Sequence, residues 1–99
     1  MIQHLVVWKL VPMPDSERES TVARFRTDLQ ALVGVVPGLR SVSLTADIRE
    51  VESNFDVALV SVHDSREALA TYQSHPDHVA IGTWWGPLVA QRGAVDSEV

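Results

Sequence analysis

The chain has 99 residues, a formal net charge of −5 and no cysteine, and 45% of its residues are hydrophobic. This length and composition suit a single globular domain over residues 1–99 and exclude a disordered or fibrous protein. The lack of cysteine excludes disulfides and thiol chemistry, and the acidic charge with scattered basic residues argues against a nucleic-acid partner or an anionic membrane surface.

No apolar stretch approaches the ~20 residues that a membrane-spanning helix needs. The opening residues, Met1 to His4, do not form the basic start of a signal peptide. We therefore expect a cytoplasmic protein with no membrane partner. The sequence has no GxGxxG, P-loop or GxSxG motif, so it gives no support for a nucleotide cofactor or for serine-hydrolase chemistry, and we expect no cofactor.

The first half of the chain predicts a strand, a helix and a second strand. Residues 2–11 are rich in Val, Leu and Ile, which is typical of a strand. Ser16 and Glu19 have the spacing of a capping box, and apolar residues then recur every three or four positions until Pro37-Gly38 stops the predicted helix. Residues 39–48 alternate between apolar and polar, as a strand with one wetter face does.

The second half predicts a third strand, a helix in two pieces and a last strand. Residues 55–62 are apolar on both faces of a strand. Asp64 and Glu67 form a second capping pair at the start of a short helix. His75-Pro76 interrupts this helix, because the residue before a proline is disfavoured in helical conformation, and the proline suits the first position of the next helix. Residues 90–99 then predict the closing strand.

The resulting order is β-α-β-β-α-β, the ferredoxin-like α+β arrangement, in which helices cover one face of an antiparallel sheet. The first and third predicted strands are apolar on both faces. Leaving half a dozen such side chains in water would forgo about 10 kcal/mol, which is comparable to the stability of a whole domain. A second copy of the chain, packed through the open sheet face, is the simplest cover. A different partner or an additional domain is the alternative.

The densest polar cluster is Tyr72, His75 and His78, near the junction of the two predicted helix pieces. Histidine can exchange a proton near neutral pH, and a tyrosine hydroxyl can donate a hydrogen bond to a carbonyl or an enolate. Each residue also has a plainer interpretation. Tyr72 continues the apolar face of its helix, His75 can cap the following helix, and His78 can form local hydrogen bonds.

Other candidates are more scattered. His4 shares a strand face with Val6 and Trp8, where a buried structural histidine is the commoner interpretation. Asp96 can partner an imidazole or simply be solvated, and Trp84-Trp85 predicts core and interface packing because only one of two neighbours can face inward. A metal site would require the four histidines to converge in the fold. Their spacing in the sequence matches no zinc motif. The four are His4, His63, His75 and His78.

Four segments together resemble the stress-responsive dimeric A/B barrel (Dabb) family over essentially the whole chain. They are IQHLVVWKL at residues 2–10, VPG at 36–38, FDVAL at 55–59 and YQSHPDH at 72–78. The resemblance implies a ferredoxin-like protomer whose sheet packs against the sheet of its twin. The expected assembly is a homodimeric α/β barrel around an internal cavity that can hold a small-molecule ligand.

The resemblance also implies roles for individual residues. In a plant member of the family, olivetolic acid cyclase, a cofactor-free aldol condensation closes a linear polyketide. By this similarity Tyr72 and His78 would be catalytic, Asp96 would orient His78, and His4 would lie in the substrate pocket. The other substrate-binding positions implied in this way are Val6, Trp8, Phe25 and Leu29.

The sequence departs from the cyclase pattern in ways that favour a smaller ligand. Trp8 replaces a smaller aliphatic residue and would shrink the cavity, Arg26 stands where an aromatic residue is expected, and no tyrosine follows Asp96. We therefore expect cofactor-free cyclase- or lyase-type chemistry on a small carbonyl compound. The alternatives are a non-catalytic stress-related or ligand-binding homodimer and, with support from the fold alone, a cofactor-independent monooxygenase.

Overall fold

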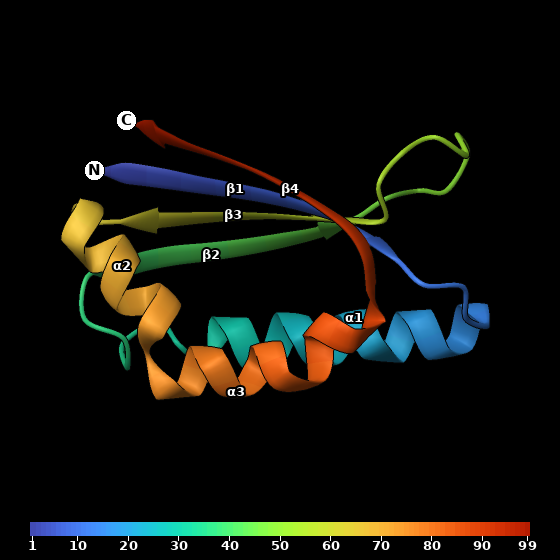
Figure 1. Ribbon diagram of the computed structural model, residues 1–99, viewed down its shortest axis with the longest axis horizontal. Helices are drawn as coiled ribbons and strands as arrows, with labels where there is room; N and C mark the ends of the chain where they lie inside the picture. The colour runs from blue at the N-terminus through green and yellow to red at the C-terminus, as the bar shows by residue number, and fades with distance from the viewer.

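The helices lie together on one face of a four-stranded antiparallel sheet in the computed structural model, which describes all of residues 1–99 (Figure 1). The strand order β2-β3-β1-β4 and the chain order confirm the predicted ferredoxin-like fold. The elements are β1 (Ile2–Leu10), α1 (Asp15–Gln30), β2 (Leu39–Ala46), β3 (Val57–His63), α2 (Arg66–Ser74), α3 (Pro76–Trp85), a 3₁₀ turn η1 (Gly86–Leu88) and β4 (Val89–Glu98). No helix is long and apolar enough to cross a membrane.

Helix α1 begins at Asp15, close to its predicted start, but its cap and its C-terminal end differ from the prediction. It begins at Asp15 after Pro14, without a side-chain cap, so the predicted capping box does not form because Ser16 already lies inside the helix. It ends at Gln30, six residues before Val36, and the chain continues in turns. The N–H groups of Leu32 and Val33 bond back only three residues, to Leu29 and Gln30, and Gly34 with a φ of +88° then prevents a right-handed helix from resuming.

The junction of α2 and α3 is set by two caps. Ser65, rather than the predicted Asp64, caps α2 by accepting a hydrogen bond from the Ala68 N–H, while Asp64 pairs with Arg40 across the surface. The Asp77 N–H donates to His75 Nδ1 over 3.1 Å at the start of α3. This confirms His75 as a helix cap and places the two helices end to end beside the sheet.

The core lies between the helices and the inward face of the sheet. Residues alternate strictly along β1, with His4, Val6 and Trp8 buried. The Trp8 ring meets those of Phe25 and Trp85 edge-on, while the Phe25 and Trp85 rings stack with centroids 3.7 Å apart. This aromatic cluster joins the central strand to α1 and α3.

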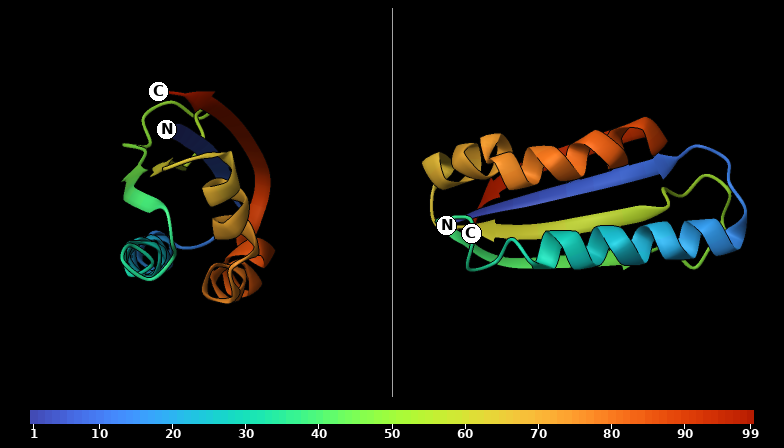
Figure 2. Two further views of the ribbon diagram at one scale, coloured as in Figure 1. Left: turned by 90° about the vertical axis from the view of Figure 1, so that its left-hand side faces the viewer. Right: turned by 90° about the horizontal axis from the view of Figure 1, so that it is seen from below.

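The opposite face of the sheet carries no helix (Figure 2). Leu5 and Val7 of β1 and Val60 and Val62 of β3 point to this face and are only partly buried, and Val95 of β4 is 63% exposed. The apolar residues that the sequence placed on a second strand face are therefore present, and no part of the chain covers them.

Gly38 provides a test of how tightly α2 is seated on the sheet. Its φ is +82°, and a Cβ at this position would stand 2.5 Å from the Ala68 Cβ. Gly38→Ala should therefore combine backbone strain with a steric clash and cost more than about 1 kcal/mol of unfolding free energy. Gly34→Ala is the matched control, because it has similar φ strain but open space around the new methyl group.

Urea unfolding of both variants measures the difference. We expect Gly38→Ala to lose clearly more stability than Gly34→Ala. Equal losses would show that α2 can shift away from the new methyl group at no cost.

Candidate functional site

A cavity of about 220 Å³ lies between the helices and the inward face of β1, β3 and β4. Of the eight residues that the sequence marked as candidates, seven line this cavity, and the eighth, Asp96, hydrogen-bonds to one of them. The lining residues are His4, Val6, Trp8, Phe25, Leu29, Leu59, Tyr72, Gln73, His78, Ile81, Gly82, Trp85, Gly86 and Arg92.

Tyr72 is the most buried aromatic residue of the site, at 1% exposure, and its hydroxyl has no hydrogen-bond partner. Burial raises the pKa of this hydroxyl to about 12, so it remains a protonated donor at neutral pH. An unpartnered buried polar group costs about 1–3 kcal/mol. The Tyr72 hydroxyl is therefore both destabilising to the empty protein and available to a ligand.

His78 lies on the first turn of α3, with its ring centroid 4.3 Å from that of Tyr72. Burial is the main cause that lowers the pKa of His78. A hydrogen-bonding contribution from the Gln73 backbone opposes this shift, and nearby charge, including that of Arg92, adds to it. At pH 7 the imidazole is therefore neutral and able to accept a proton.

His4 and Asp96 form a second polar unit of the site. They are directly opposed in the register of β1 and β4, and His4 Nδ1–H donates to the Asp96 carboxylate. A donor at Nδ1 leaves Nε2 as the acceptor nitrogen of the neutral ring. The observed partner of Asp96 is thus His4, whereas the sequence led us to expect Asp96 to orient His78.

The site contains further polar groups beyond those given a catalytic or substrate-binding role from the sequence, where His63 was considered only as a metal ligand and Trp85 only as a packing residue. His63 is fully buried, its Nε2 lies 2.9 Å from the Ser61 hydroxyl, and its ring packs 4.8 Å from the Tyr72 ring. Burial is also the main cause that lowers the pKa of His63. The Trp85 indole nitrogen is buried without a partner, and Arg92 lines the cavity from β4. The alternation of β3 puts Ser61 and His63 on the inward face and could have identified this pair.

The histidines do not form the metal site that the sequence left open. No group of three or more His, Asp or Glu side chains is arranged to hold a metal ion. His75 uses its Nδ1 to cap α3, away from the cavity.

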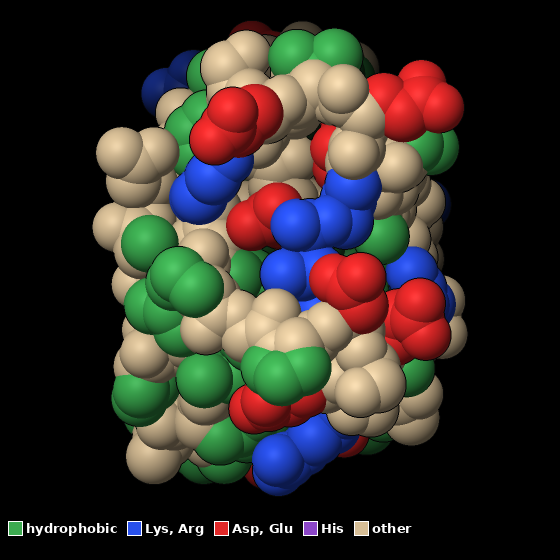
Figure 3. All heavy atoms as spheres, turned by 90° about the vertical axis from the view of Figure 1, so that its right-hand side faces the viewer, with side chains coloured by type: hydrophobic (Ala, Val, Ile, Leu, Met, Phe, Trp, Pro, Cys, Tyr) green, Lys and Arg blue, Asp and Glu red, His purple; other side chains and the backbone are tan.

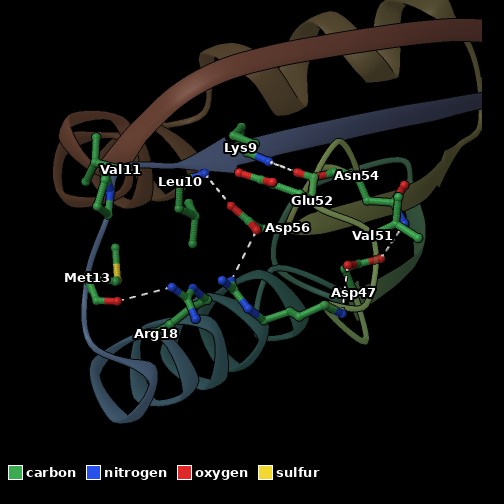
Figure 4. Close-up of a pocket in the computed structure, with 12 residues that line it drawn as sticks. Lys9, Leu10, Val11, Met13, Arg18, Asp47, Val51, Glu52, Asn54 and Asp56 are labelled. Carbon is green, nitrogen blue, oxygen red and sulfur yellow. Dashed lines mark hydrogen bonds and ion pairs between the residues drawn. The ribbon is translucent and has the colours of Figure 1, made fainter.

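A second hollow, of about 310 Å³, lies where β1 meets the loop between β2 and β3 (Figure 4). Its charged groups are engaged with one another. Lys9 Nζ donates to the carbonyls of Glu52 and Asn54 over 2.8 and 2.9 Å, and Asp56 accepts from the Leu10 N–H and from Arg49. Acidic and basic side chains lie side by side on this end of the molecule (Figure 3). The network anchors the loop and leaves few free groups for a ligand.

Comparison with known proteins assigns the chain to a family. The model of the stress responsive A/B barrel domain (Dabb) matches residues 2–99. The chain belongs to this family. No curated protein sequence matches it.

Solved structures of other proteins share the Dabb fold. A dimeric ferredoxin-like protein of unknown function from Thermobifida fusca is 28% identical, with a TM-score of 0.83, over 99% of this chain and 90% of its own. One from Bacteroides fragilis, also described as dimeric, is 25% identical with a TM-score of 0.89, over 99% and 95%. Hydroxynitrile lyase from Passiflora edulis has a TM-score of 0.80 at 12% identity, over 99% and 92%, which shows a shared fold alone.

The lowered pKa values of His63 and His78 predict acid sensitivity of this Dabb protein. In the unfolded chain both imidazoles take up a proton near pH 6.5, whereas in the folded protein they resist it. The unfolded state then binds more protons, so the free energy of unfolding should fall as the pH drops below about 6.5.

Thermal unfolding between pH 8 and pH 5 measures this effect. We expect the melting temperature of the wild type to fall toward pH 5 and the fall to be smaller in the double variant His63→Asn/His78→Asn. An unchanged slope in the double variant would assign the acid sensitivity to other groups.

Proposed function

We propose that this protein is a homodimer that carries out cofactor-free acid–base chemistry, of lyase or cyclase type, on a small carbonyl compound in the cavity. The observation that carries the proposal is the buried, unpartnered Tyr72 hydroxyl beside two imidazoles, His4 and His78. Removal of a proton from the carbon next to a carbonyl requires a base for that proton and a hydrogen-bond donor for the carbonyl oxygen. The imidazoles can supply the base, and the protonated Tyr72 hydroxyl can supply the donor.

The dimer is supported by the uncovered sheet face. Its apolar residues on β1 and β3 are already partly buried, so each gains at most about a third of the roughly 1.5–3 kcal/mol of full burial, and a second copy supplies a face of the same kind. The relatives from Thermobifida fusca and Bacteroides fragilis are described as dimeric. We infer that two protomers pack sheet against sheet and leave the cavity of each on the outer, helical side of its own sheet.

The roles of the polar groups follow from their partners. The Asp96 carboxylate accepts a hydrogen bond from His4 Nδ1–H and fixes the ring, so His4 Nε2 is assigned as the acceptor of the proton from the C–H group next to the substrate carbonyl. The electron pair of that bond moves to the carbonyl oxygen, which becomes an enolate and accepts a hydrogen bond from Tyr72. His78 is neutral and packs against Tyr72, so it is assigned as a second imidazole that can accept the proton from the same C–H group.

The cavity walls support a small substrate with an apolar body. The volume of about 220 Å³ is bounded by Val6, Leu29 and Ile81 and narrowed by the aromatic cluster around Trp8. The hydroxynitrile lyase from Passiflora edulis shares the fold, so this architecture is compatible with a lyase. A long-tailed polyketide would not fit in this volume.

A non-catalytic ligand-binding role is the second candidate. The observation that favours it is the close packing of Trp8, Phe25 and Trp85, which fills much of the space between the sheet and the helices. In such a protein the same cavity would bind a small molecule without transforming it.

Deuterium exchange at the carbon next to a carbonyl tests the catalytic proposal. We expect the wild type to accelerate this exchange for acetone or acetophenone in D₂O, followed by proton NMR. Tyr72→Phe should lower the rate by about 100-fold, the usual cost of one oxyanion donor. It should leave the melting temperature unchanged or higher, because the hydroxyl has no partner to lose.

His4→Gln and Asp96→Asn separate the roles of the two imidazoles. Both should reduce exchange by a similar factor, and His78→Gln should reduce it less. An exchange rate in Tyr72→Phe equal to that of the wild type would contradict the role assigned to the Tyr72 hydroxyl. A wild type without exchange would favour the non-catalytic candidate.

The homodimer predicts a specific response to a charge on the open sheet face. Val60→Asp should shift the protein from dimer to monomer in light scattering coupled to gel filtration, because a carboxylate would be buried without a partner. Val33→Asp, an exposed position after α1, is the matched control and should remain dimeric. A wild type that is monomeric at micromolar concentration would contradict the dimer directly.

A further inference from the structure

We propose that Arg92 and the indole N–H of Trp85 form a carboxylate-binding subsite at one end of the cavity, so that the substrate is a small oxo acid. This inference rests on the proposed function and narrows the substrate class of the same site. Neither residue was identified as a candidate from the sequence, and neither takes part in the proton transfer assigned above.

Arg92 is unusual because it has no acidic partner. In a chain with 13 acidic and eight basic residues, ion pairs are easily formed. Every other arginine makes one or donates to a backbone carbonyl: Arg18 to Asp15, Arg24 to Asp28, Arg40 to Asp64, Arg49 to Asp56, Arg66 to Glu98 and Arg26 to the Leu44 carbonyl. Arg92 makes no such contact and lines the cavity.

The second donor comes from Trp85, which lines the same cavity. Arg92 is opposite Trp8 in the register of β1 and β4, and the Trp8 ring meets the Trp85 ring with centroids 5.6 Å apart. Trp85 is 4% exposed, and its indole nitrogen is buried without a partner although the residue lines the cavity. An unpaired cation and an unpaired N–H donor therefore belong to residues that line the same cavity, and both residues neighbour Trp8.

The donor end and the reactive end start from different positions along β1, yet Arg92 is close enough to His78 for its charge to lower the pKa of His78. His4 and Trp8 are four residues apart on β1, a rise of roughly 13 Å, and Val6 lies between them on the same face. A ligand that spans the cavity can place its carbonyl near Tyr72 and its anionic group near Arg92. The apolar residues between the two ends suit a short hydrocarbon linker.

A carboxylate matches these donors. Its two oxygens can accept from the guanidinium fork and from the indole N–H, and charge-assisted bonds of this kind are among the stronger ones in proteins. The net charge of −5 disfavours anions elsewhere on the protein, so the exposed, unpaired cation of Arg92 at the cavity favours the binding of an anion there.

Binding would also affect the chemistry. The positive charge of Arg92 is one of the causes that lower the pKa of His78. A bound carboxylate offsets that charge and makes His78 a better proton acceptor when the substrate is in place. An arginine on an edge strand also discourages strand-to-strand aggregation, but that role requires no contact with the cavity.

Paired ligands that differ only in charge test the subsite. We would titrate the wild type with levulinate and β-benzoylpropionate, and with the methyl ester of each, by calorimetry or NMR. We expect each carboxylate to bind about ten-fold or more tightly than its ester. Arg92→Gln should abolish this preference, Arg92→Lys should restore part of it, and Trp85→Phe should reduce it while keeping the aromatic ring.

Arg40→Gln is the matched control, because Arg40 lies on β2 at the other edge of the sheet and pairs with Asp64. It should keep the wild-type preference. Equal affinity of acid and ester, a preference that survives in Arg92→Gln, or no binding of either ligand would overturn the subsite.

Because binding requires no turnover, the two proposals fail separately. Arg92-dependent binding of carboxylates without deuterium exchange would remove the catalytic proposal and retain the subsite. Exchange of neutral ketones without any preference for carboxylates would do the opposite.

Discussion

The pairing register of β1 with β4 is the constraint on which the site depends. This register puts Asp96 beside His4 at one end of the cavity and Arg92 beside Trp8 at the other. Side chains alternate between the two faces of a strand, so a shift of one residue would turn the carboxylate and the guanidinium to the opposite face. The positions of the charged groups at the two ends of the cavity are therefore set by the hydrogen bonds between β1 and β4 and not by a loop.

The unpartnered polar atoms of the core are concentrated near this cavity. Only four buried side-chain nitrogen or oxygen atoms lack a partner in the whole chain, and those of Tyr72, Trp85 and His63 lie in or directly behind the cavity wall. A purely structural core would replace such groups with apolar ones, because each costs about 1–3 kcal/mol when it is unpaired. Their concentration at one place supports a ligand-binding role for the cavity.

Much of the fold could be predicted because it depends on local patterns. Strand alternation, the His75-Pro76 break and the Pro37-Gly38 turn are local signals, and they led to the correct element order. The end of α1 was misjudged because the apolar period continues through residues whose backbone can no longer be helical after Gly34. The partner of Asp96 and the position of Arg92 could not be read from the sequence, because both follow from a strand register between opposite ends of the chain.

In the proposed dimer one face of the sheet lines the cavity and the other face forms the interface between protomers. The inward residues of β1 line the cavity, and its outward residues, such as Leu5 and Val7, belong to the face between protomers. Completing the burial of these apolar side chains would contribute on the order of a few kcal/mol per protomer, which is comparable to the cost of about 1–3 kcal/mol for each unpartnered group of the cavity. Dimerisation would thus offset the cost of a polar cavity in a 99-residue chain. In the proposed dimer the partner would pack against the other face of the strand that carries His4, so a monomeric form should hold its reactive groups less firmly.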